Sequence, residues 1–211
     1  LQTQAELQNK IFAAANRSRG VYSAMAQAVS KIGLLAGEAF DSNDELIAFT
    51  ELLQKSFKIA GASAGEQASA MLQLSQAMAA GRLQGDEFRS IMENAPMLAD
   101  AIAKYMGRSK GELKELSKEG EITADIIKNA IFMAADDINA KFATMPMTFG
   151  DVWNKIKNGA LKAFQPVMEK INEIINVPEF ANFINNIIGG INLIANGINK
   201  LISFIQNNWG I

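Results

Sequence analysis

The sequence contains no cysteine and no histidine among its 211 residues. Their absence excludes disulfide bonds, thiol nucleophiles, histidine acid–base catalysis and the common zinc sites. Carboxylate chemistry is left, but neither acidic pair, Asp86-Glu87 nor Asp136-Asp137, suggests an acid and a base facing one cleft. We therefore expect no catalytic, metal-binding or cofactor-binding residues and no cofactor, and we expect that the protein is not an enzyme.

Proline and aromatic residues are also scarce. Four prolines leave long stretches available to helix, and an aromatic content of 8% favours helix over sheet. The hydrophobic share of 49% and the charged share of 20% are typical of globular proteins. The net charge is −2, whereas general DNA or RNA binders are far more basic, so we expect no specific nucleic-acid site.

The N-terminus carries no visible targeting signal. The first residue is Leu1 rather than methionine, so we expect the chain to be a fragment of a longer protein. A signal in that longer protein would then precede Leu1.

Helical periodicity predicts an all-α protein with a compact multi-helix domain over residues 1–145, followed by two long C-terminal helices over residues 146–211. Strand-like alternation is absent from the pattern. The helices expected in the compact domain span approximately residues 1–18, 21–37, 42–60, 63–81, 85–94, 96–107, 109–120 and 123–146.

The same residue types recur at the predicted ends of the helices. Three capping boxes are predicted, at Ser42 and Glu45, Ser63 and Glu66, and Ser109 and Glu112. Glycines follow several of these helices, and we expect at least one of Gly61 and Gly81 to end its helix in the left-handed conformation. In the helix over 42–60, the predicted buried face consists of Leu46, Phe49, Leu53 and Phe57.

Most charged clusters have an ordinary structural explanation. Asp86-Glu87 is expected in the first turn of a helix, where carboxylates interact favourably with the helix dipole. Asp136-Asp137 is expected to be solvated. The basic run of Lys155, Lys157, Lys162 and Lys170 is interrupted by Glu169 and Glu173, which favours a solvated helix face over a phosphate track.

The chain changes character after Pro146. Thr148 and Asp151 predict the start of a helix that reaches about Asn176, with a kink at the internal Pro166. Its apolar residues form a stripe of Phe149, Trp153, Ile156, Ala160, Phe164, Val167, Ile171 and Ile174. After Pro178, a last helix is expected over residues 179–209.

That last helix carries a heptad seam, and beyond Glu179 its only charged residue is Lys200. The seam residues alternate in spacing between four and three: Phe180, Ile184, Ile187, Ile191, Ile194, Ile198, Leu201 and Ile205. They could pack on the same domain, on other copies or against a membrane. We favour a seam between other copies of the chain, because isoleucine at both heptad positions favours three or more strands, whereas Asn and Lys are costly in lipid.

Residues 35–160 resemble the conserved N-terminal domain of tailed-phage tape measure proteins. The resemblance is carried by the order and spacing of several motifs rather than by any one of them. They are IAFTELLQKSFKIAG, QLSQAMAAGRLQGDEFRSI, Asn94-Ala-Pro96, Met106-Gly107-Arg-Ser109, Glu119-Gly120-Glu-Ile-Thr123 and Met145-Pro146-Met-Thr148. The Asn-rich sequence after Asn176 lies outside the resemblance.

The resemblance implies a structural protein of a bacteriophage or prophage tail. Such a protein sets tail length during assembly, lies in the tail tube and leaves it around DNA ejection. It implies tail tube and tail assembly proteins as partners, and a location in the virion tail after assembly in the bacterial cytoplasm. The alternative is a membrane-active or pore-forming helical protein with host membrane contact through the uncharged last helix. A cell-wall hydrolase segment is disfavoured by the missing His and Cys.

Overall fold

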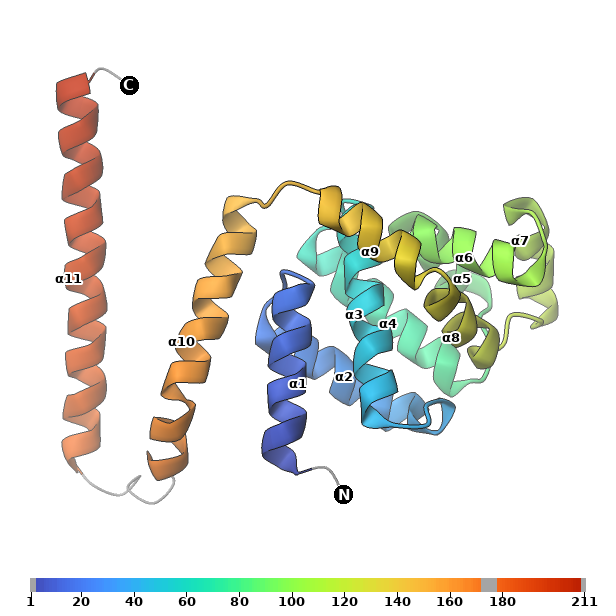
Figure 1. The fold of residues 1–211 in the computed structure, drawn as a ribbon, viewed down its shortest axis with the longest axis horizontal. Coiled ribbons are helices and arrows are strands. Elements are labelled where there is room, and N and C mark those ends of the chain that lie inside the picture. Colours follow the sequence, from blue (N-terminus) through green and yellow to red (C-terminus); the bar gives the residue numbers. More distant parts are fainter. Residues whose placement is uncertain (1–2, 172–177, 210–211) are drawn as a thin grey trace. The chain divides into compact units, whose positions relative to one another are not determined.

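The computed structural model describes residues 3–171 and 178–209, and most of these residues are helical (Figure 1). Within the described residues, extended pairing is limited to one isolated bridge between Arg82 and Thr123. The predicted all-α class is confirmed.

Twelve helical elements follow one another along the described chain. They are α1 (Gln4–Arg17), α2 (Tyr22–Ala36), the 3-10 helix η1 (Gly37–Ala39), α3 (Asn43–Ile59), α4 (Ala64–Ala79), α5 (Gly85–Asn94), α6 (Pro96–Met106), α7 (Lys110–Glu119), α8 (Ala124–Met133), α9 (Ala135–Thr144), α10 (Phe149–Ile171) and α11 (Pro178–Trp209).

Two compact units divide the chain, over residues 1–160 and 161–211. The first therefore includes the beginning of α10 as well as α1 to α9. The expected domains, 1–145 and 146–211, stay a prediction.

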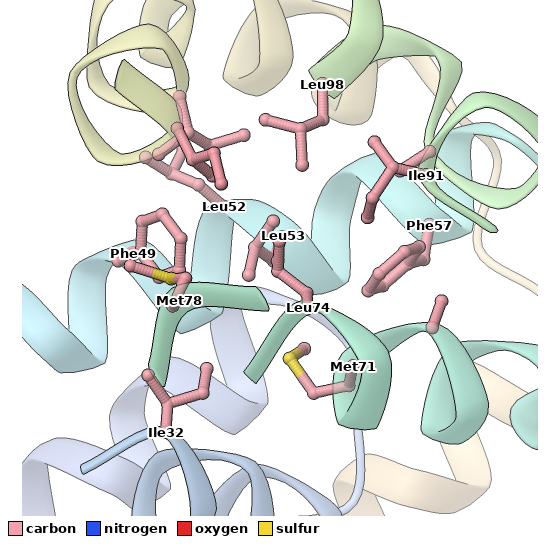
Figure 2. Close-up of a cluster of buried hydrophobic side chains, with 14 of the residues drawn as sticks. Ile32, Phe49, Leu52, Leu53, Phe57, Met71, Leu74, Met78, Ile91 and Leu98 are labelled. Atoms are coloured by element: carbon pink, nitrogen blue, oxygen red, sulfur yellow. The ribbon is translucent and has the colours of Figure 1, made fainter. Parts of the chain in front are cut away.

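The core of the first unit is centred on α3. Its predicted apolar face is confirmed, since Phe49, Leu53 and Phe57 are fully buried and Leu46 is nearly so. Figure 2 shows side chains from α2, α4, α5 and α6 converging on this face, among them Ile32, Leu74, Ile91 and Leu98. Methionines contribute to the same core, as Met71, Met78 and Met97 are buried. Hydrophobic burial is the main force that holds these helices together.

Two of the three predicted capping boxes are confirmed. The Ser63 and Ser109 hydroxyls accept the backbone N–H of Glu66 and Glu112, and each glutamate accepts the N–H of its serine in return. The third is only half formed. The Ser42 hydroxyl accepts from the N–H of Glu45, but the Glu45 carboxylate accepts the N–H of Asp41, one residue earlier than a capping box requires.

Both tested glycines end their helices as predicted. Gly61 and Gly81 each have φ of 76°. The following residue then donates back into the last turn, from Ala62 N to Phe57 O and from Arg82 N to Ala77 O. This pattern is the Schellman motif, which satisfies carbonyl groups that the helix leaves unpaired.

The single helix predicted over 123–146 is wrong. The chain breaks into α8 and α9 at Ala134, whose ψ of 2° lies outside the helical range. The physical reason is packing, because α8 lies mainly against α6 whereas α9 lies mainly against α3. One straight helix could not bury both Ile131 and Ile138 against these two neighbours. Asp136-Asp137 is exposed, as expected, and lies in the first turn of α9.

Candidate interaction surfaces of the C-terminal helices

The start of α10 is fixed by a reciprocal cap. The Thr148 hydroxyl accepts the N–H of Asp151 at 3.1 Å, and the Asp151 carboxylate accepts the N–H of Thr148 at 3.0 Å. The predicted start is therefore confirmed. A carboxylate in this position also interacts favourably with the N-terminal end of the helix dipole.

Asp151 also pairs with a lysine of α3. The Lys58 ammonium lies 2.6 Å from Asp151 Oδ1 and also donates to the backbone carbonyl of Arg19 at 2.6 Å. Burial raises the pKa of the Asp151 carboxyl, but hydrogen bonds from Lys58 and Thr148 lower it by more, so the pKa lies below its ordinary value. The ionised carboxylate is therefore the form that the fold favours.

Asn158, two turns further along α10, is 1% exposed, and both its side-chain oxygen and its side-chain nitrogen form hydrogen bonds. Its oxygen accepts the N–H of Tyr22 at 2.8 Å. Its amide nitrogen donates to the carbonyl of Gly20 at 2.8 Å and to the side chain of Asn16 at 3.0 Å. Asn158 thereby satisfies partly buried backbone groups at the corner between α1 and α2.

We call Asp151, Asn154 and Asn158 the polar lock. Asn154 completes it by donating to the Arg19 carbonyl at 3.3 Å. Arg19 itself has φ of 54°, in the left-handed region that few residues other than glycine adopt. Its guanidinium lies 4.6 Å from the centre of the Phe142 ring and donates to the Met145 carbonyl at 2.9 Å. The α1–α2 corner thus binds both the end of α9 and the start of α10.

A second polar cluster stabilises the same unit. Glu51 and Lys55, one turn apart on α3, are each 7% exposed and form an ion pair at 2.6 Å. Arg17 adds a two-point contact to the Glu51 carboxylate, and this hydrogen bonding raises the pKa of Arg17. Lys55 also donates to Asn139 of α9. The sequence analysis predicted neither this cluster nor the polar lock. The available signal for the cluster was the i,i+4 spacing of Glu51 and Lys55 among the apolar residues of α3.

The apolar stripe of α10 is exposed where the structure describes it. Phe149 is 85% exposed, and Trp153 and Ile156 are each about half exposed. Ala160, Phe164 and Val167 continue the exposed stripe, whereas Ile171 and Ile174 lie outside the residues whose side chains are described. Pro166 lies inside the helix as expected, and its kink stays a prediction. The first turns of α10 therefore contact α3 and the α1–α2 corner through polar residues, whereas the described apolar residues of the stripe are exposed.

The seam of α11 shows the same property over its described part. Ile191, Ile194 and Ile198 are between 53% and 66% exposed, and Ile187 is partly exposed. The side chains of the other four predicted seam residues lie outside the described residues: Phe180, Ile184, Leu201 and Ile205. What covers the seam stays a prediction.

The same helix meets the length and composition expected of a membrane span over 19 residues, Asn186–Phe204. One such helix is weak support for membrane insertion, and its asparagines and Lys200 would be costly in lipid.

Among the described residues, no group of three acidic side chains is placed to hold a metal ion. A cavity of about 310 Å³ lies beside the α1–α2 corner, between α2, α3 and α4. Its lining includes Ala24, Phe57, Gln67 and Met71, together with the lock residue Asn154. Two lysines also line it, Lys31 and Lys58, and Lys58 is paired with Asp151.

In a comparison with protein families, residues 1–169 match the family described as tape measure protein. No curated protein and no solved structure matches the chain. The match includes α1 to α9 and most of α10, and therefore also the polar lock and the described stripe. The chain thus belongs to the tape measure protein family, whose members are structural components of bacteriophage tails.

Proposed function

We propose that this chain is a segment of the protein that sets tail length during assembly, lies in the tail tube and leaves it around DNA ejection. The observation that carries the proposal is the family match over residues 1–169. The compact unit would serve as the folded start of the segment, and two long C-terminal helices would form its extended part. The protein would be made in the bacterial cytoplasm and end in the virion tail, with tail tube and assembly proteins as partners.

Helix geometry supports a length-setting role. A helix rises about 1.5 Å per residue, so the 32 residues of α11 span about 48 Å. Extended helix therefore converts sequence length into physical length in direct proportion. A compact domain does not have this property, because adding residues to it changes its volume rather than its reach.

Other copies of the chain are the partners that we propose for the α11 seam. Eight apolar residues at heptad spacing would each contribute about 1.5–3 kcal/mol when fully enclosed. Ile191, Ile194 and Ile198 are each more than half exposed, and this supports the proposal. A contiguous exposed apolar face commonly marks a site where a partner binds.

The length-setting role can be tested in an assembled phage. Duplicating residues 187–207 in the full-length protein adds three heptads and about 32 Å of helix. We expect tails longer by about that amount in electron micrographs. The control replaces Asn192 and Asn199 by Gln, which leaves the chain length and the expected tail length unchanged. Tails of unaltered length after the duplication would contradict the proposal.

A membrane-active role is the second candidate, favoured by the span Asn186–Phe204. Dye-loaded vesicles of bacterial lipid composition provide the test. If α11 inserts, the wild-type chain should release the dye, and Leu193→Asp, at the centre of the span, should suppress the release. No release at micromolar protein would exclude this role.

A further inference from the structure

The two sides of α10 have opposite chemistry. At 3.6 residues per turn, successive side chains are about 100° apart around the helix axis. The polar lock residues then centre about 165° away from Phe149, Trp153 and Ile156. Over residues 151–158, the polar side of α10 therefore contacts α3 and the α1–α2 corner, and the apolar side is directed away from these contacts.

The polar lock prevents α10 from rolling its apolar side onto its own unit. Rolling would separate Asp151 from Lys58, leaving a lysine whose side chain is only 20% exposed without its carboxylate. It would also withdraw Asn158 from the backbone of Gly20 and Tyr22, leaving these groups unpaired. Both losses would lower the free energy of unfolding, because a charge or polar group without its partner is costly where water is largely excluded. The polar lock therefore keeps the apolar side of the first turns of α10 from packing on α1 to α9.

The exposed side is large enough for a stable contact. Aromatic side chains bury about 150–250 Å² each, and aliphatic ones less. With the observed exposed fractions, the apolar residues between Phe149 and Val167 offer roughly 600 Å² of apolar surface. Two such faces together bury about 1,200 Å², which reaches the size of a standard protein interface.

We propose that a second copy of this chain covers the apolar side of α10, with Phe149, Trp153 and Ile156 at the centre of the contact. This inference rests on the proposal that the chain associates with copies of itself, and it adds an interface separate from the α11 seam. The central residues are uncharged, so the matching surface must also be apolar, and symmetric pairing supplies one from the same sequence. Gly159, Ala160 and Ala163 are small and permit close helix approach.

Trp153 provides a direct readout of the contact. In a Trp209→Phe background, the emission of the chain reports Trp153 alone, since the sequence contains two tryptophans. We expect the emission to shift to the blue as concentration rises, together with a rising sedimentation coefficient. Ile156→Asp should abolish the emission shift. Lys155→Asp, which alters an exposed side chain away from the stripe, should leave it intact.

The outcomes separate this inference from the seam proposal. If Ile191→Asp and Ile198→Asp dissociate the chain while Trp153 emission never changes with concentration, the α10 contact is wrong and the seam stands. Emission that is blue at every concentration in a chain that sediments as a monomer would also overturn the α10 contact. So would an emission shift that occurs only when lipid vesicles are added.

Cross-linking gives a second measurement that does not depend on fluorescence. Because the chain has no cysteine, Ile156→Cys introduces a single thiol on the stripe. We expect mild oxidation to give a disulfide-linked dimer at concentrations where Lys155→Cys gives none. Equal cross-linking at both positions would indicate random collision and contradict the proposed contact. Ile156 is 54% exposed, so neither of its substitutions should unfold the first unit, which circular dichroism can verify.

Discussion

The ammonium group of Lys58 on α3 lies 2.6 Å from the carboxylate of Asp151 on α10, an ion pair between residues 93 positions apart. Both side chains are mostly buried, at 20% and 11% exposure. The same lysine donates to the carbonyl of Arg19, so one side chain joins α3, α10 and the α1–α2 corner. This arrangement holds α10 on the first unit through charge and hydrogen bonds rather than apolar packing.

Replacing Asp151 should give a pH-dependent loss of stability. Because the folded-state pKa of this carboxyl lies below its unfolded value of about 3.9, its stabilisation is present above pH 4 and is lost as the pH falls through the folded pKa. We expect Asp151→Asn to lower the free energy of unfolding by about 1.5–3 kcal/mol at pH 7. Urea denaturation at several pH values should show this difference shrinking below pH 4.

An exposed carboxylate provides the control for this experiment. Glu93 lies in the last turn of α5 and is exposed, so Glu93→Gln should change stability by less than about 0.5 kcal/mol. A loss for Asp151→Asn that stays constant from pH 7 to pH 2.5 would show that the ion pair is not its cause.

Glu51 and Lys55 should behave as a coupled buried pair. Glu51→Ala leaves the Lys55 ammonium in a nearly buried site without its carboxylate, and such losses cost about 3–5 kcal/mol. Replacing both residues by methionine removes the two charges together, so we expect a smaller loss than from Glu51→Ala. Arg17 can return to solvent, since its side chain is 57% exposed. Chemical denaturation of the single and double variants tests this order, and a double variant as unstable as Glu51→Ala would refute the coupling.

Most of the fold follows from local signals in the sequence. Ser63, Ser109 and Gly81 act within one helical turn, so their roles depend on neighbouring residues and could be predicted. The break at Ala134 could not, because no glycine or proline marks it. It arises from two distant helices, α6 and α3, that lie against α8 and α9.

The candidate surfaces could be predicted only in part. The spacing of Phe149, Trp153 and Ile156 identified an apolar stripe, and such a stripe usually faces the core of its own domain. Its exposure depends on Asp151 and Asn158, whose partners lie more than 90 positions earlier in the chain. An asparagine in an amphipathic helix gives no sign in sequence that it will be buried.

Gly81 and Gly65 offer a matched test of backbone conformation. An added Cβ would meet nothing within 4 Å at either position, but only Gly81 has positive φ, at 76°. Gly81→Ala should therefore destabilise the chain by about 1–2 kcal/mol, the cost of the left-handed conformation for a residue with a Cβ. Gly65→Ala, in the first turn of α4, should be neutral or stabilising by up to about 1 kcal/mol. Thermal denaturation measures both, and equal effects would show that the φ angle is not decisive.

The α11 seam gives the last prediction. Ile191→Asp together with Ile198→Asp places two charges on the seam, two helical turns apart, and should dissociate an oligomer into monomers. The matched control is Asn192→Asp with Asn199→Asp, which adds the same charge with the same spacing one residue off the seam. We expect the control to keep the oligomer, because its carboxylates face solvent. Sedimentation equilibrium distinguishes the two.

The folded first unit should survive the seam substitutions, because Ile191 and Ile198 lie outside residues 1–160. Circular dichroism should therefore show its cooperative unfolding at an unchanged temperature. If the wild-type chain sediments as a monomer at high concentration, the intermolecular seam is wrong. The seam would then be covered within its own chain, and the same pair of substitutions should lower the unfolding temperature instead, because they would remove buried apolar contacts.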